Sequence, residues 1–144
     1  MNGMALHGGL MPFGGTFHMF SDYAKSAMRM SALMKIRSIA VLTHDSIGQG
    51  EDGPTHQPIE NTSAMRYIPN MDVWRPADSV EVAVAWTCSV ERKDGPSSLV
   101  LSRQGIPGRK HDAVDFDGMR KGAYVLAEAN GRRSEEHTSE LQSR

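Results

Sequence analysis

Apolar residues recur along this chain at two spacings. Over residues 16–34 they recur every three or four positions, which predicts a helix with one apolar face and Thr16 as its N-cap. That face comprises Phe17, Phe20, Ala24, Ala27, Ser31 and Met34. Residues 39–42 instead form the unbroken apolar run IAVL, which is typical of a short parallel strand covered on both faces.

A second long helix is predicted in the middle of the chain. Asp78 is a suitable N-cap, and the helix is expected to end near Arg92 and Lys93, whose charges suit a helix carboxyl terminus. Its apolar side is predicted to carry Val80, Ala83, Val84, Trp86, Cys88 and Val90.

Shorter elements complete the predicted alternation. We expect a short helix over residues 57–65 and an irregular strand over residues 66–74. Two more strands are predicted over residues 98–101 and 122–127, joined by a connection rich in Gly, Pro and Asp at residues 104–118. Strands that alternate with helices of ten or more residues indicate an α/β fold with a mostly parallel sheet flanked by helices.

The first predicted strand leads directly into residues 43–58, which read THDSIGQGEDGPTHQP. Ligands in open α/β sheets bind beyond the carboxyl ends of strands, and glycines let the backbone turn sharply beside a ligand. The segment combines three glycines with the polar side chains of His44, Asp45, Glu51, Asp52 and His56. This placement predicts a binding site at the end of a strand.

Composition excludes several classes of protein. The chain has 144 residues, of which 39% are hydrophobic, and this suits one domain or a piece of one. Its 16 basic and 17 acidic residues nearly balance and form no stripe, so neither nucleic acid nor a membrane is an expected partner. The single cysteine, Cys88, excludes an internal disulfide framework, and the amino-terminal segment lacks the pattern of a secretory signal. We expect a cytoplasmic protein.

Residues 133–144 differ from the rest of the chain. From 133 to 143 they read RSEEHTSELQS, which a common sequencing-adapter string encodes residue for residue. We therefore interpret residues 133–144 as a non-native polar tail and residues 1–132 as a partial domain. A genuine polar helical tail that begins at Ser134 is the alternative.

Four runs, in this order, resemble the pyrimidine-binding domain of the transketolase family: NGMALHGGLMPFGGTFHMFSDYA, THDSIGQGEDGPTHQP, NMDVWRPAD and DGPSSLVLSRQ. The resemblance covers residues 2–131 and implies an incomplete form of that fold. It also implies a thiamine diphosphate-dependent enzyme that moves a two-carbon ketol unit from a ketose phosphate to an aldose phosphate. In this family the aminopyrimidine ring of the cofactor lies in an aromatic pocket, whose residues match Phe17, Phe20 and Tyr23. From helical spacing alone, a stripe of core residues is the preferred interpretation of these rings.

The resemblance assigns the sugar contacts to four further residues. His44 and Arg103 are expected to bind the substrate phosphate, because an imidazole and a guanidinium fork donate hydrogen bonds to a dianion. Asp52 is expected to accept a hydrogen bond from a sugar hydroxyl and so to read its stereochemistry. His56 is expected to contact the transferred unit and to act in catalysis as a proton shuttle. Each residue taken alone is also explained by a turn, a strand cap or a surface ion pair.

A metal site in this chain is not favoured. His44, Asp52 and His56 lack the short i, i+4 histidine spacing of zinc enzymes, so we assign no metal ligand here. The resemblance is imperfect at two positions, since His18 and Gln49 stand where the family usually has aliphatic residues.

Other groups implied by the resemblance are not found in these 144 residues. Family members have a glutamate upstream of the NGMALHGG run, and a GDG motif in a preceding domain that holds magnesium or calcium with the diphosphate. The DG pairs here read EDG, KDG and FDG. We therefore expect part of a homodimer, completed by the second subunit's diphosphate-binding domain and inactive as a free chain. The first strand and helix of the domain are also expected to be missing, which would uncover a sheet edge and apolar surface.

Two other functions stay open from the sequence. One is a non-catalytic module that uses this fold only to dimerise. The other is a different thiamine diphosphate-dependent transferase such as dihydroxyacetone synthase, which shares much of the THDSIGQGEDGPTHQP segment. That segment argues more strongly against a deoxyxylulose phosphate synthase.

Overall fold

The computed structural model describes residues 1–126 of the chain, and the predicted tail lies outside this range. It divides into two units, Met1–Arg109 and Lys110–Arg144, which are described separately. In the described part of the first unit, four strands form one sheet in the order β1-β2-β4-β3, and every neighbouring pair is parallel. The strands are β1 (Phe13–Phe17), β2 (Ile39–Thr43), β3 (Asp72–Trp74) and β4 (Ser97–Val100).

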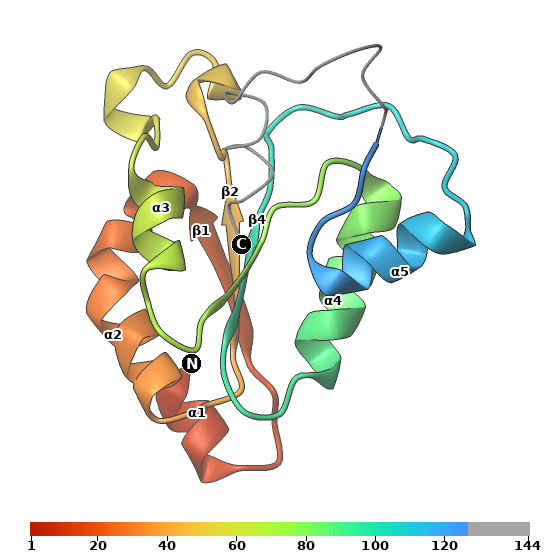
Figure 1. The fold of residues 1–144 in the computed structure, drawn as a ribbon. Coiled ribbons are helices and arrows are strands. Elements are labelled where there is room, and N and C mark those ends of the chain that lie inside the picture. Colours follow the sequence, from red (N-terminus) through yellow and green to blue (C-terminus); the bar gives the residue numbers. More distant parts are fainter. Residues whose placement is uncertain (127–144) are drawn as a thin grey trace. The chain divides into compact units, whose positions relative to one another are not determined.

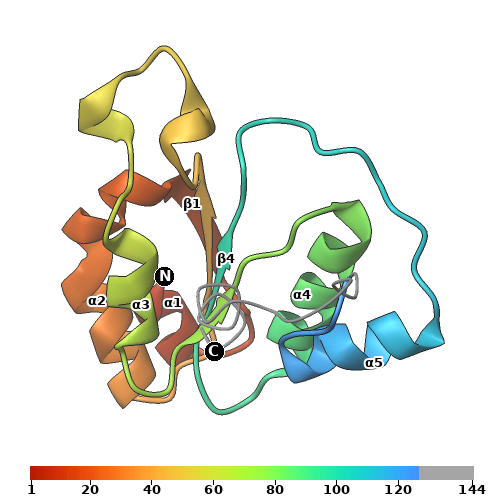
Figure 2. The same cartoon turned by 45° about the horizontal axis from the view of Figure 1, so that its top comes forward.

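Helices cover both faces of this sheet. Helices α2 and α3 lie on one face and α4 lies on the other (Figures 1 and 2). The bounds are α1 (Asn2–His7), α2 (Ser21–Leu33), α3 (Asn61–Arg66) and α4 (Ser79–Glu91), with short 3-10 helices η1 (His18–Phe20), η2 (Ile47–Gln49) and η3 (Pro54–His56). The predicted α/β architecture with a parallel sheet is confirmed. None of the helices within residues 1–126 has the length and apolar character needed to cross a membrane.

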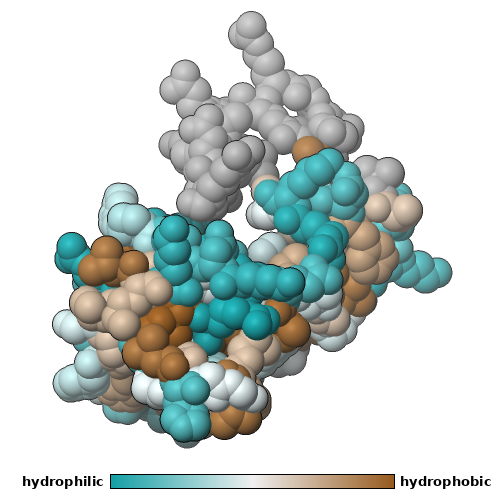
Figure 3. Space-filling view, turned by 90° about the horizontal axis from the view of Figure 1, so that it is seen from below, coloured by the Kyte–Doolittle hydropathy of each residue, from teal (hydrophilic) through white to brown (hydrophobic). Residues whose placement is uncertain are grey.

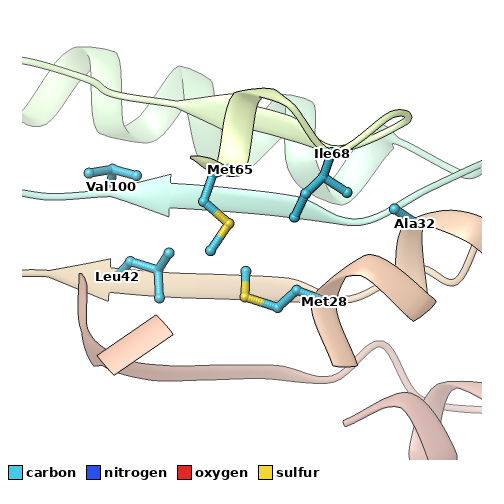
Figure 4. Packing of buried hydrophobic residues seen from close by; sticks show 6 residues of the cluster. All are labelled: Met28, Ala32, Leu42, Met65, Ile68 and Val100. Carbon is cyan, nitrogen blue, oxygen red and sulfur yellow. The ribbon is translucent and has the colours of Figure 1, made fainter. Parts of the chain in front are cut away.

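Alternate residues of the two central strands build the two halves of the core. On one face, Leu42 of β2 and Val100 of β4 pack against side chains from α2 and α3 (Figure 4). On the other face, Ile39 and Leu99 pack against Ala85 of α4. Because successive residues of a strand point to opposite faces, a strand buried on both faces must be apolar throughout, as IAVL is.

The predicted helix over residues 16–34 is wrong at its start. Its first residues belong to β1 and η1, so α2 begins only at Ser21. The strand was missed because Gly14 and Gly15 leave no apolar alternation to recognise, and pairing with the buried strand β2 overrides weak local propensity.

The predicted faces of the two long helices are only partly correct. Residues predicted to face the core but exposed are Ala27, Met34, Ala83 and Val90. Residues buried but not predicted are Ser21, Met28, Ala32, Ala85 and Ser89. In α4 the small Ala85 and Ser89 lie inward, and the Ser89 hydroxyl donates to the carbonyl of Ala85 at 2.7 Å. A pattern of apolar residues does not reveal this face, because its side chains are small and the serine hydroxyl is hydrogen-bonded within its own helix.

Other boundaries moved by a few residues. The short helix predicted over residues 57–65 is α3, which starts later and runs through Arg66. The strand predicted over residues 66–74 is reduced to β3, while that predicted over residues 98–101 is confirmed one residue earlier as β4.

The second unit differs from the prediction. Part of the predicted connection over residues 104–118 is the helix α5 (Ala113–Lys121). The Asp112 carboxylate accepts from the Asp115 N–H at 3.0 Å, and the Asp115 carboxylate accepts from the Asp112 N–H at 3.1 Å. This reciprocal cap resembles a capping box built with aspartate and starts the helix. Residues 122–126 form no strand, and residue 127 of the predicted strand lies outside the described range.

One end of the first unit exposes apolar side chains. Helix α1 has no buried residue and is tied to α2 by Asn2, whose Nδ2 donates to the carbonyl of Ala27 at 2.8 Å. Figure 3 looks onto the molecule from the end at which α1 lies in Figure 1, and shows apolar residues among polar ones. The exposed large apolar side chains near this end of the sequence are Met1, Met4, Leu6, Leu10 and Phe13.

The N-cap of α4 gives a testable stability prediction. Asp78 is buried, and its Oδ1 accepts from the N–H groups of Val80 and Glu81, each at 3.0 Å. Asp78→Ala is expected to lower the free energy of unfolding of the chain by about 1–2 kcal/mol, because both donors lose their acceptor. Chemical denaturation of the two proteins measures this. Asp94→Ala, which removes an exposed carboxylate paired with Arg92, is the control and should cost less than about 1 kcal/mol. Equal losses in the two variants would contradict the capping role.

Candidate functional site

The predicted site residues lie at the carboxyl ends of the two adjacent strands β1 and β2. Phe17, the last residue of β1, pairs in register with Thr43, the last residue of β2. The next residue, His44, has a φ of 59°, a left-handed conformation that is uncommon outside glycine and is found at functional sites. Its imidazole lies flat on the Phe17 ring, with centroids 3.6 Å apart and planes inclined by 15°. The strand end therefore places His44 directly over Phe17.

Five rings gather at this point, and we name Phe17, Phe20, Tyr23, His44 and His56 the aromatic cluster. Phe20 lies 6.1 Å from Phe17 and 6.1 Å from Tyr23 between ring centroids, and both pairs are within 26° of parallel. The segment after β2 folds back so that His56 meets Phe20 edge-on, with centroids 5.0 Å apart and planes at 84°. Tyr23 is 89% exposed, whereas Phe17 and Phe20 are half-buried. The predicted aromatic residues therefore share one partly open site with both histidines.

Gln49 holds the segment between the two histidines in shape. Its side chain is 1% exposed, and its Nε2 donates to the carbonyl of Gly53 at 3.0 Å. Gly50 and Gly53 have φ values of 95° and 76°, which side-chain-bearing residues rarely adopt. An internal side-chain bond and two glycine turns thus close this loop on itself.

Arg103 approaches the same loop from the next strand along the sheet. It follows β4, and a Cβ built on Gly50 would lie 3.4 Å from the Arg103 Nη1. The guanidinium is exposed and makes no hydrogen bond or ion pair within residues 1–126. A cation held beside the loop without a carboxylate partner is suited to an incoming anion.

Asp52 is a predicted site residue for which the structure gives no contact with the aromatic cluster. It lies on the loop next to Gly53, is exposed, and contacts no member of the cluster through a hydrogen bond or ion pair within the described part of the chain. Asp45, by contrast, is fixed, because its Oδ2 accepts from Nη2 of Arg75 at 2.9 Å. This ion pair ties the start of the loop to the segment that follows β3.

A buried histidine lies behind the aromatic cluster. His18 of η1 is fully buried, and its Nε2 is 2.9 Å from Oγ1 of Thr62 at the start of α3. Burial lowers the pKa of His18 below its ordinary value, partly offset by the carboxylates of Asp45 and Asp22 and reinforced by Arg75. His18 is therefore neutral at physiological pH.

A hollow in the first unit lies apart from these residues. This pocket, beside α1 and α2, has none of the predicted site residues in its lining. Its walls are mostly small or apolar, and include Gly15, Ala24, Met28 and Leu42. We place the functional site at the aromatic cluster, because polar groups able to recognise a ligand converge there and not in this pocket.

Residues 1–108 match the family described as "Transketolase, pyrimidine binding domain". The chain belongs to this family. It is 56% identical over 131 residues to Transketolase 2 of Aliivibrio fischeri and 59% identical over 130 residues to Transketolase 2 of Xanthobacter flavus. These alignments cover 91% and 90% of this chain but only 20% and 19% of the relatives. The chain thus spans about a fifth of the length of the transketolases that it matches.

Solved structures agree with the transketolase family assignment. A Pichia stipitis transketolase in complex with sedoheptulose-7-phosphate superposes with a TM-score of 0.83 at 44% identity, covering 90% of this chain and 19% of that one. A structure described as a split gene transketolase, inactive beta4 tetramer, superposes with a TM-score of 0.62 at 31% identity, covering 74% of this chain and 34% of that one. The resemblance expected from the four sequence runs and the predicted fold are both confirmed.

Some residues that shape this candidate site were not predicted from sequence. The roles of Thr62 and Arg75 depend on contacts with His18 and Asp45 that are distant in sequence, so no local pattern signals them. Gln49 and His18 did give a signal, because each puts a polar side chain where the family usually has an aliphatic one. Both are now seen to be buried and hydrogen-bonded.

Proposed function

We propose that this chain is the pyrimidine-binding segment of a transketolase, in which a two-carbon ketol unit passes from a ketose phosphate to an aldose phosphate with thiamine diphosphate as cofactor. The observation that carries the proposal is the aromatic cluster, in which three near-parallel carbocyclic rings stand beside two histidines at the end of adjacent strands. Family membership and 59% identity to a named transketolase support it.

The aromatic cluster fits the flat aminopyrimidine ring of the cofactor. His44 already covers one face of Phe17, so an added ring would contact Phe20 and Tyr23, of which Tyr23 is widely exposed. Offset stacking on such rings adds about 0.5–1.5 kcal/mol per pair beyond burial. When bound, the cofactor supplies a thiazolium that stabilises the carbanion of the transferred unit. The residues of this chain orient it and hold the sugar.

The polar residues around the cluster have separate roles in the proposal. Arg103 binds the substrate phosphate with its free guanidinium fork, and His44 assists it. His56 is bonded through Nδ1 to Oγ1 of Thr55 at 2.8 Å, which leaves Nε2 to contact sugar oxygens and to carry a proton. The carboxylate of Asp52 is exposed, and it accepts a hydrogen bond from a hydroxyl of the bound sugar. This bond selects the stereochemistry of that hydroxyl.

The remaining parts of the enzyme are proposed to come from outside these residues. The cofactor's diphosphate and its magnesium or calcium ion would be held by a diphosphate-binding domain of the second subunit of a homodimer. Turnover is not expected from this chain alone. The structure described as a split gene transketolase, inactive beta4 tetramer, supports this expectation.

A ring-deletion variant tests the proposal. In a chimera, the matched residues of this chain replace the corresponding segment of the Xanthobacter flavus transketolase. Phe20→Leu is expected to weaken apparent thiamine diphosphate affinity about 2- to 12-fold, because a stacking partner is lost while an apolar side chain remains. Activity titrated against cofactor concentration measures this.

Phe13→Leu is the matched control for this variant. Phe13 is 68% exposed, is the first residue of β1, and packs edge-on against Trp86 rather than in the aromatic cluster. It should leave cofactor affinity unchanged. Equal effects of the two variants, or no effect of Phe20→Leu, would reject the cofactor role and favour a module that only dimerises.

A further inference from the structure

His18 joins the aromatic cluster to helix α3. It lies in η1 between Phe17 and Phe20, and it is completely buried. Its Nε2 meets Oγ1 of Thr62 at 2.9 Å, and the neighbouring Nδ2 of Asn61 donates to the carbonyl of Met19 at 3.4 Å. Two side chains at the start of α3 therefore hold η1, and with it the rings at either end of η1.

The other ring nitrogen of His18 has no hydrogen-bond partner among the described residues. With the proton on Nε2, the bond to Thr62 is made and only an acceptor lone pair at Nδ1 is left unpaired, which costs less than a buried unpaired donor. A second proton at Nδ1 would create that unpaired N–H and a buried charge together. Buried charges without partners are strongly unfavourable, so the protonated side chain must reach water.

The charged groups facing His18 do not remove this cost. Asp22 of α2 and Asp45 of the loop after β2 favour the charged imidazole, and Arg75 after β3 opposes it. Asp45 is itself paired with Arg75 at 2.9 Å, so much of its field at His18 is offset. Burial is the largest influence, and it keeps the pKa of His18 below its ordinary value.

We propose that neutral His18 is a positioning residue that holds Phe17 and Phe20 in the aromatic cluster, and that protonation at Nδ1 releases η1 from α3 and loosens the cluster. The role goes beyond cofactor and sugar binding, and it does not depend on the proposed enzymatic function. It makes the shape of the site sensitive to mild acid.

The direction of the pH effect follows from the lowered pKa. In the unfolded chain His18 titrates near its ordinary value of about 6.5, whereas the folded protein takes up the proton only at lower pH. Above about pH 6.5 the residue is neutral in both states and adds no pH dependence. As pH falls through that value, the unfolded state binds more protons and stability declines, until the folded state is also protonated.

The test follows ring resonances of the complete 144-residue chain by NMR, without any cofactor. Phenylalanine and tyrosine rings are isotopically labelled, and the ring-current shifts of Phe17, Phe20 and Tyr23 are recorded between pH 8 and pH 5. The comparison includes His18→Gln, which keeps an amide able to bond Thr62 and does not titrate in this range. Thr62→Val removes the hydroxyl with little change in shape.

In the wild type the stacked ring shifts of Phe20 and Tyr23 are expected to collapse toward free-residue values as pH falls below about 6.5 and His18 becomes protonated. His18→Gln should keep them throughout, and Thr62→Val should weaken them already at pH 8. Wild-type shifts that stay unchanged once the imidazole of His18 has taken up its second proton would overturn the proposal. An equal collapse in His18→Gln would also overturn it, since a group other than His18 would then be responsible.

A second measurement on the wild type covers the case in which His18→Gln does not fold. Imidazole nitrogen spectra identify the protonation state of each histidine separately. The proposal requires an Nε2–H tautomer of His18 at pH 7 and a protonation midpoint that coincides with the change at Phe20 and Tyr23. Separate midpoints would show that His18 does not control the cluster.

Discussion

Arg103→Ala is expected to lower kcat/KM for a phosphorylated donor sugar by about 10- to 150-fold, which corresponds to the roughly 1.5–3 kcal/mol of a hydrogen bond to a charged group. The guanidinium stands beside Gly50 with no carboxylate partner in the described chain, so it is available to a phosphate. The same variant should leave kcat/KM for the unphosphorylated sugar unchanged. Steady-state kinetics of the chimeric transketolase with both sugars provides the measurement.

Arg109→Ala is the control for this substitution. Arg109 is also exposed, and its contact with Asp78 is made through the backbone N–H, which alanine retains. Arg109→Ala should change kcat/KM for neither the phosphorylated nor the unphosphorylated sugar. An equal loss on both sugars in Arg103→Ala would reject the phosphate role, because the effect would then be one on the general shape of the site.

Leu99→Ala should give the largest loss of stability. Leu99 is fully buried in the central strand β4 and belongs to the core formed with Ile39 and Ala85. Removing its side chain loses the transfer free energy and leaves a cavity between sheet and helix, at a cost of about 2–5 kcal/mol. Denaturant unfolding of the complete chain measures it. Leu33→Ala, at a position 73% exposed on α2, should cost far less, and similar losses in both would contradict the assigned core.

Sequence patterns predicted the central part of the fold and failed at its edges. The apolar runs that form β2 and β4 are buried on both faces of the sheet. Such a run therefore predicts a strand without knowledge of the neighbouring elements. Strand β1 depends on pairing with β2, and its two glycines carry no pattern of their own. Helix α5 starts from reciprocal carboxylate caps at Asp112 and Asp115, a local signal that the high content of Gly, Pro and Asp concealed.

The candidate site was more predictable in its members than in its geometry. The five rings of the aromatic cluster lie together, although neither the sequence nor the resemblance gave a hint that His44 stacks on Phe17. Such stacking follows from the left-handed backbone of His44, which periodicity does not report. The cofactor-binding roles of the three carbocyclic rings and the sugar-binding roles of His44, His56, Asp52 and Arg103 stay predictions, because ligand contacts are needed to test them.

The most direct test of the account is an experimental structure of the chimeric enzyme with thiamine diphosphate and a ketose phosphate bound. We predict that the aminopyrimidine ring lies against Phe20 and Tyr23, and that Arg103 holds the sugar phosphate beside the loop that follows β2. A pyrimidine ring bound away from the aromatic cluster, or a phosphate that Arg103 does not contact, would contradict it.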